Sequence, residues 1–128
     1  MPVNFTKNDS NDLAIIDIVG NVTLEEILNA VKQYETSGLS KFEIYNFQNY
    51  TGPHLGLEEL RNVSTIILNI ANIRPQGSKT VLLWSESDPV GFGISRQVIS
   101  LLEVKNVHFE MNVFYNMNEA LAWLGIAQ

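Results

Sequence analysis

The sequence predicts an α/β fold: a small, mixed and mostly parallel sheet flanked by helices, in the order β-β-α-β-α-β-α-β-α. Two observations carry this prediction. Short apolar and β-branched segments alternate with longer segments of helical period, and this alternation is typical of parallel strands covered by helices. The chain has 128 residues, the length of one domain. We therefore expect residues 1–128 to form a single domain.

Five elements are predicted in the first half of the chain: strands near 3–5 and 13–19, a helix over 24–37, a strand at 41–47 and a helix from 57 to about 73. The run 13–19 is typical of a strand covered on both faces. Thr23 and Glu26 form a capping box, in which each side chain binds a backbone N–H that the helix leaves free. Residues 46–56 are expected to form a loop.

Four elements are predicted in the second half: a strand at 80–84, a helix beginning near Pro89, a strand at 107–115 and a short helix ended by Gly125. Ser87 or Asp88 can cap the first of these helices, with Pro89 in its first turn. Apolar and polar residues alternate along 107–115. This period of two indicates a strand with one exposed face, at an edge of the sheet.

Composition excludes several classes of function. Eight basic against fourteen acidic residues give a net charge of −6, which argues against nucleic acid as the main ligand. The absence of cysteine excludes disulfides, thiolate metal sites and a cysteine nucleophile. No segment has the roughly 18–20 apolar residues that span a bilayer, and the N-terminus has no signal pattern. We expect a cytoplasmic protein without a membrane span.

Catalytic and cofactor motifs are missing from the sequence. The two histidines, His54 and His108, lie far apart and lack the spacing of a metal site. There is no P-loop and no G-x-S-x-G turn. Gly91-Phe92-Gly93 resembles half of a dinucleotide fingerprint, but Arg96 stands where the third glycine is required. The favoured interpretation is that these glycines allow close packing at a helix start. We expect no catalysis, no cofactor and no metal.

Candidate binding residues lie where parallel sheets usually hold ligands, at the carboxyl ends of the strands. The two loops that carry them contribute Tyr50, Thr51, Gly52, Trp84, Ser87, Asp88, Phe92 and Arg96. Thr51 precedes a helix, so a phosphate on its hydroxyl would meet the positive end of the helix dipole. The alternative for Thr51 is an ordinary turn with a local hydrogen bond.

Arg96 is one of only eight basic residues and would lie one to two turns into the helix that begins near Pro89. A helix N-terminus favours anions, so an anion site is expected near it. The alternative is an arginine paired with an exposed acid such as Glu103.

The C-terminal third resembles the STAS/SpoIIAA-like family. It carries a G-x-S-R-like helix start at Gly93-Ile94-Ser95-Arg96, and residues 113–124 follow the pattern V-F-x-x-x-x-E-A-x-x-W-L. The resemblance implies a small mixed sheet with helices and no known catalysis. Better-studied members are anti-sigma-factor antagonists, which bind a partner kinase and are switched by phosphorylation of a serine in a D-S-S-G-like loop. Here the matching stretch reads Gln48-Asn49-Tyr50-Thr51-Gly52, without the aspartate and the paired serine.

These observations favour a non-catalytic regulatory or protein-interaction domain. It would dock a protein partner through the loops at the strand carboxyl ends and the helix that begins near Leu57. The alternative is a carrier or sensor of a small apolar, lipid-like or anionic molecule, held by side chains among Tyr50, Trp84, Phe92 and Arg96. A peripheral membrane contact and a homodimer also stay open. The edge strand at 107–115 would suit a dimer unless its polar residues prevent pairing.

Overall fold

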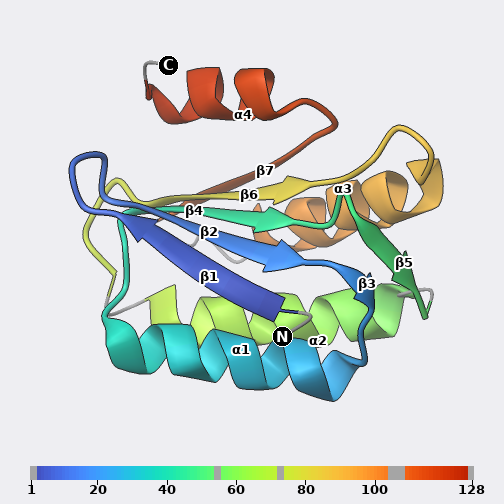
Figure 1. The fold of residues 1–128 in the computed structure, drawn as a ribbon. Helices are drawn as coiled ribbons and strands as arrows, with labels where there is room; N and C mark the ends of the chain where they lie inside the picture. The colour runs from blue at the N-terminus through green and yellow to red at the C-terminus, as the bar shows by residue number, and fades with distance from the viewer. Residues whose placement is uncertain (1–2, 54–55, 72–73, 104–108, 127–128) are drawn as a thin grey trace.

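The computed structural model describes residues 3–53, 56–71, 74–103 and 109–126. Within these residues one mixed sheet has the strand order β1-β2-β4-β6-β7 (Figure 1). Its strands are β1 (Val3–Asn8), β2 (Leu13–Ile18), β4 (Phe42–Asn46), β6 (Lys79–Leu83) and β7 (Glu110–Phe114). β1 pairs antiparallel with β2, and every other pair of neighbours is parallel. The predicted α/β fold with a mixed, mostly parallel sheet is confirmed.

Helices cover both faces of the sheet (Figure 1). One face carries α1 (Leu24–Ser37), α2 (Leu57–Ala71) and α3 (Pro89–Glu103), and the other carries α4 (Met117–Leu124). The capping box at the start of α1 is confirmed. Glu26 N donates to Thr23 Oγ1 at 3.2 Å, and Thr23 N donates to Glu26 Oε1 at 3.1 Å. The end predicted for the second helix near residue 73, and the start of the last strand at 107, lie outside the described residues.

A second, very small sheet was not predicted from the sequence. β3 (Gly20–Asn21) pairs in parallel with β5 (Tyr50–Gly52), inside the segment expected to be a loop. Two backbone hydrogen bonds of 2.8 Å fasten it, from Gly20 N to Asn49 O and from Val22 N to Gly52 O. The pairing ties the chain that leaves β2 to the chain that leaves β4.

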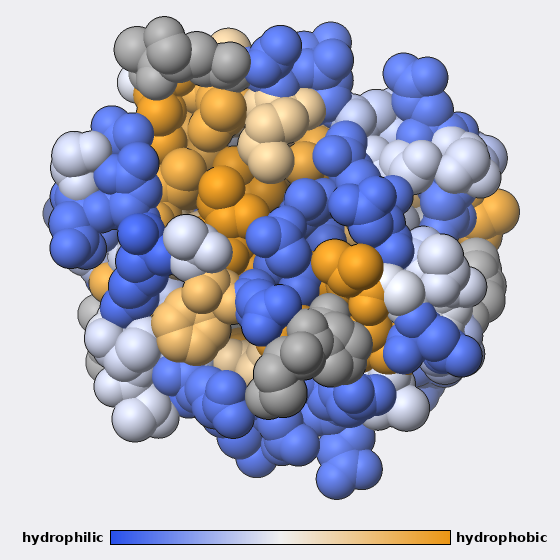
Figure 2. Space-filling view, in the orientation of Figure 1, coloured by the Kyte–Doolittle hydropathy of each residue, from blue (hydrophilic) through white to orange (hydrophobic). Residues whose placement is uncertain are grey.

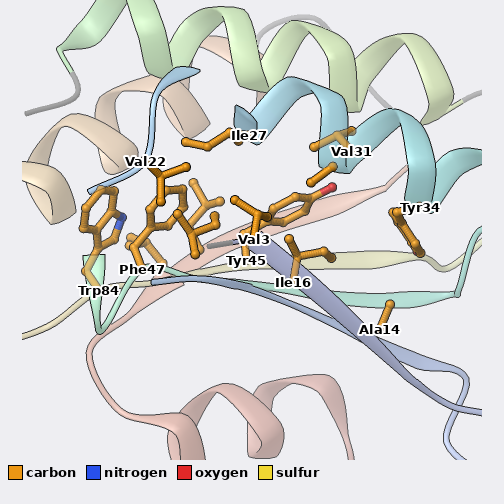
Figure 3. Packing of buried hydrophobic residues seen from close by; sticks show 14 of the residues in the cluster. Val3, Ala14, Ile16, Val22, Ile27, Val31, Tyr34, Tyr45, Phe47 and Trp84 are labelled. Carbon is orange, nitrogen blue, oxygen red and sulfur yellow. The ribbon is translucent and has the colours of Figure 1, made fainter. Parts of the chain in front are cut away.

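Two apolar layers fill the space on either side of the sheet. In the larger layer, side chains of α1 such as Ile27 and Val31 pack with Ile16 and Tyr45 of the sheet (Figure 3). In the smaller layer, Ala120 and Leu124 of α4 pack in one cluster with buried residues of the sheet. β2, β4 and β6 contribute buried residues to both layers in alternation, as the period of two requires.

An ion pair lies inside the larger layer, where apolar side chains surround it. Glu43, the second residue of β4, contacts Arg74 at 3.3 Å, and neither side chain is exposed. Thr80 Oγ1 accepts from Arg74 Nη1 at 2.7 Å and donates to Glu43 Oε1 at 3.0 Å. The Tyr34 hydroxyl donates to Glu43 Oε2 at 2.7 Å and accepts from Ser40 N at 2.8 Å. The carboxylate is therefore bound on both oxygens.

Burial and neighbouring charges shift the pKa values of two groups in this network, Glu43 and Tyr34. Burial raises the pKa of the Glu43 carboxyl above its ordinary value, while the charge of Arg74 and the hydrogen bonds from Tyr34 and Thr80 oppose this rise. Burial, followed by the nearby Glu43, raises the pKa of Tyr34 far above its usual range. Tyr34 therefore keeps its proton and remains the donor to Glu43.

We expect the two charges to depend on each other for stability. Glu43→Leu or Arg74→Met alone should lower the free energy of unfolding by about 3–5 kcal/mol, because each leaves a buried charge without its partner. The double variant should lose much less than the sum of the two. Urea denaturation of all four proteins measures this coupling.

An ion pair at the surface serves as the control for this comparison of single and double variants. Lys79 Nζ lies 3.8 Å from Glu110, whose side chain is 68% exposed. Glu110→Gln should change the free energy of unfolding by less than about 1 kcal/mol. Additive losses in the Glu43 and Arg74 variants would show that the buried pair is not coupled.

Candidate functional site

The carboxyl ends of the central strands meet along one margin of the sheet. We call this margin the carboxyl edge and define it as residues 19–21, 47–52 and 84–90, which follow β2, β4 and β6. Three aromatic side chains pack together there. The ring of Trp84 stacks on Phe47 with centroids 4.4 Å apart and an angle of 8°, and Tyr50 lies edge-on to both. Trp84 is only 1% exposed, so it supports the surface from below and does not form part of it.

The first turn of α3 is fitted closely to Trp84. Trp84 Nε1 donates to the buried Ser95 Oγ at 2.8 Å. A Cβ atom added at Gly91 would lie 2.6 Å from Cζ3 of the Trp84 ring, which is closer than atoms can pack. The interpretation that the glycines allow close packing is therefore correct for Gly91. It does not apply to Gly93, around which nothing lies within 4 Å of such an atom.

Of the two caps considered from the sequence, Ser87 and Asp88, it is Asp88 that caps α3. Its Oδ1 accepts from Gly91 N at 3.0 Å, with Pro89 at the first helical position. Ser87 turns instead to Ser85, with 2.8 Å between the two hydroxyl oxygens. The carboxylate of Asp88 therefore occupies the place at the helix N-terminus where an external anion would bind.

Tyr50, Thr51 and Gly52 form β5 at the surface of the carboxyl edge. The side chain of Thr51 is exposed and accessible to modification. The Tyr50 hydroxyl is buried without a hydrogen-bond partner among the described residues. Burial raises the pKa of Tyr50, and the negative charges of Asp88 and Glu59 raise it further.

Phe92 lies beside the carboxyl edge, where its N–H donates to Asp88 O at 3.4 Å, whereas Arg96 lies apart from the other candidate residues. Phe92 stacks on Tyr115 with centroids 4.0 Å apart and an angle of 13°. Arg96 lies in an open groove of about 610 Å³ beside β7, which we call the β7 groove. The groove is lined by Arg96, Ile99, Ser100 and Glu103 of α3, by residues 109–113 and by Trp123 of α4.

Arg96 therefore does not join the residues at the carboxyl edge. Glu103, the partner considered from the sequence, lies in the same groove. Within the described residues, however, Arg96 forms no ion pair within 4.0 Å. Arg96 is exposed, so its charge is accessible to a carboxylate of another molecule.

Two functional candidates were missed from the sequence. In the described part of the chain, the large hydrophobic residues classed as exposed are Val19 at 46% and Val90 at 52%. Both belong to the carboxyl edge, Val19 directly after β2 and Val90 in the first turn of α3. β2 and β6 flank β4, so the ends of these two strands lie about 10 Å apart. Nothing in the apolar run 13–19 distinguishes Val19 from its buried neighbours.

A membrane-spanning helix and a metal-binding cluster are both absent from the described residues. None of their helices is long and apolar enough to span a bilayer. The acidic side chains of these residues form no group of three or more that could hold a metal ion. His54 and His108 lie outside the described residues.

Comparison with known proteins assigns no family to this chain. No family model matches the sequence, and neither a curated protein nor a solved structure matches it significantly. The structure itself supports an α/β fold built on a five-stranded mixed sheet.

The contact between Gly91 and Trp84 predicts opposite effects for two nearby substitutions. Gly91→Ala should lower the free energy of unfolding by about 1–3 kcal/mol, because the new methyl group would overlap the Trp84 ring. Gly93→Ala should raise it by about 0.5–1 kcal/mol, because alanine favours the helix and meets nothing. Urea denaturation of the two variants measures the difference. Equal effects would contradict the close fit of α3 to Trp84.

Proposed function

We propose that this chain is a non-catalytic interaction domain of the STAS/SpoIIAA-like kind, and that it docks a protein partner through the carboxyl edge. The exposed pair Val19 and Val90 carries the proposal. Protein interfaces commonly have apolar anchors near their centre and polar groups around them. Here the polar surroundings are the exposed side chains of Asn21, Thr51 and Ser87.

The base below this surface is held in place before a partner arrives. The β3–β5 pairing fixes the loops that follow β2 and β4. The Asp88 cap and the contact of Trp84 with Gly91 and Ser95 fix the loop after β6. A preordered surface loses little conformational entropy on binding, which favours docking.

The charge near the carboxyl edge indicates the kind of partner. Glu58 and Glu59 lie in the first turn of α2, and Glu86 and Asp88 lie in the loop before α3. The chain as a whole carries a net charge of −6. A partner with an apolar centre and a basic rim would be complementary to this surface.

The alternative, a carrier of a small molecule, has less support. Phe47, Trp84 and Tyr50 fill the space at the strand ends with their own rings. In the β7 groove, Arg96 is accompanied by Glu103 and Glu110, which oppose an anionic ligand. Phosphorylation of the exposed Thr51 would add up to two negative charges to the carboxyl edge, which would strengthen its attraction for a basic protein partner. We therefore favour protein docking.

The proposal is tested by site-specific photo-crosslinking in the native cells. A photoreactive residue is placed at Val19 and, as the matched control, at the exposed Gln76 on the opposite margin of the sheet. We expect one recurrent protein to crosslink at position 19 and not at position 76. Val90→Ser should reduce its yield at position 19 several-fold, because an apolar anchor contributes on the order of 1–2 kcal/mol.

The control variant for that loss is Gln76→Ser, which should leave the yield at position 19 unchanged. Crosslinks of equal strength at positions 19 and 76 would contradict docking at the carboxyl edge. So would a yield at position 19 that Val90→Ser leaves unaltered.

A further inference from the structure

β7 ends the sheet, and its outer side has no neighbouring strand among the described residues (Figure 1). On its inner side, Glu110 N donates to Ser78 O at 3.1 Å and Trp84 N donates to Phe114 O at 3.0 Å. Backbone groups alternate in direction along a parallel strand. The N–H and C=O groups of Met111 and Val113 therefore point outward, away from β6.

This outer side of β7 is accessible, because it forms the floor of the β7 groove. α3 forms one wall and Trp123 of α4 lies on the other side. Asn112 Oδ1 accepts from Val113 N at 2.8 Å, so one outward donor is covered by a side chain. The outward groups of Met111 have no such cover in the described residues. A strand of a second molecule would find the edge open at this position.

The charges in the groove suit a second copy of the same chain. α3 leads from the carboxyl end of β6 to the amino end of β7, so it runs opposite to β7. Arg96 and Glu103 lie on its groove side, seven residues and about 10 Å apart along the helix axis. A twofold axis perpendicular to the sheet and passing beside β7 would set the two α3 helices side by side and antiparallel.

In that arrangement each Arg96 faces Glu103 of the other copy, and the contact occurs twice. Arg96 has no ion pair within its own described chain, so the second copy would supply the missing carboxylate. The remaining charged group of the groove, Glu110, lies near Lys79 of its own chain at 3.8 Å. Opposite charges placed by symmetry favour the antiparallel pairing.

We propose that β7 is the pairing edge of a symmetric homodimer, in which two five-stranded sheets join and Arg96 of each copy pairs with Glu103 of the other. The two carboxyl edges would remain uncovered and point in opposite directions. The dimer is independent of the docking function proposed above, since it uses a different margin of the sheet.

A charge-reversal experiment on the full chain tests the dimer by light scattering over a series of concentrations. We expect a dimer for the unaltered protein. Arg96→Glu alone and Glu103→Arg alone should each weaken dimerisation by about tenfold or more, because each places like charges opposite each other twice. An equimolar mixture of the two variants should recover the dimer, since both contacts then join opposite charges.

Two further measurements separate pairing from misfolding and from net charge. Glu35→Arg reverses a charge at an exposed site of α1 and should leave the dimer unchanged. Hydrogen exchange at the Met111 amide should slow as the unaltered protein becomes more concentrated. A protein that stays monomeric at every concentration, or a mixture that does not recover the dimer, would overturn the proposal.

Discussion

A carboxylate and a guanidinium meet inside the sheet–helix layer, without contact with water, and the placement of the surrounding elements depends on them. Glu43 comes from β4, Thr80 from β6, Tyr34 from α1 and Arg74 from the segment after α2. Either charge buried alone would cost several kcal/mol. Any packing that moved α1, or the segment after α2, away from β4 would leave one group unsatisfied. Apolar contacts tolerate many arrangements, whereas this network accepts few.

The two margins of the sheet differ in what they can bind. The carboxyl edge carries the exposed side chains of Val19 and Val90, and Phe47 and Trp84 stack in the same margin of the sheet. The β7 groove exposes backbone groups and a cation with no ion pair in the described chain, which suits a strand with complementary charge. A hydrophobic area also lies on the face shown in Figure 2.

The sequence was sufficient for features that arise from local periodicity and capping. The order of the strands and helices, the capping box at Thr23 and the cap at Asp88 all follow from residues close together in the chain. Features that depend on distant residues were not predictable. Glu43 resembles any polar residue of a strand until Arg74 is placed beside it, and β3 and β5 are too short to show a pattern. Arg96 was expected at the carboxyl edge, but the path of α3 carries it to the β7 groove.

Native-state hydrogen exchange tests the role of the buried ion pair most directly. If the network joins β4, β6 and α1 into one cooperative unit, the amides of Ile44, Val81 and Val31 should exchange only through global unfolding, with the same free energy of opening. Their free energies should also fall together as denaturant is added. Opening of α1 at a distinctly lower free energy than β4 and β6 would contradict this, because Tyr34 would then leave Glu43 while the sheet stayed intact.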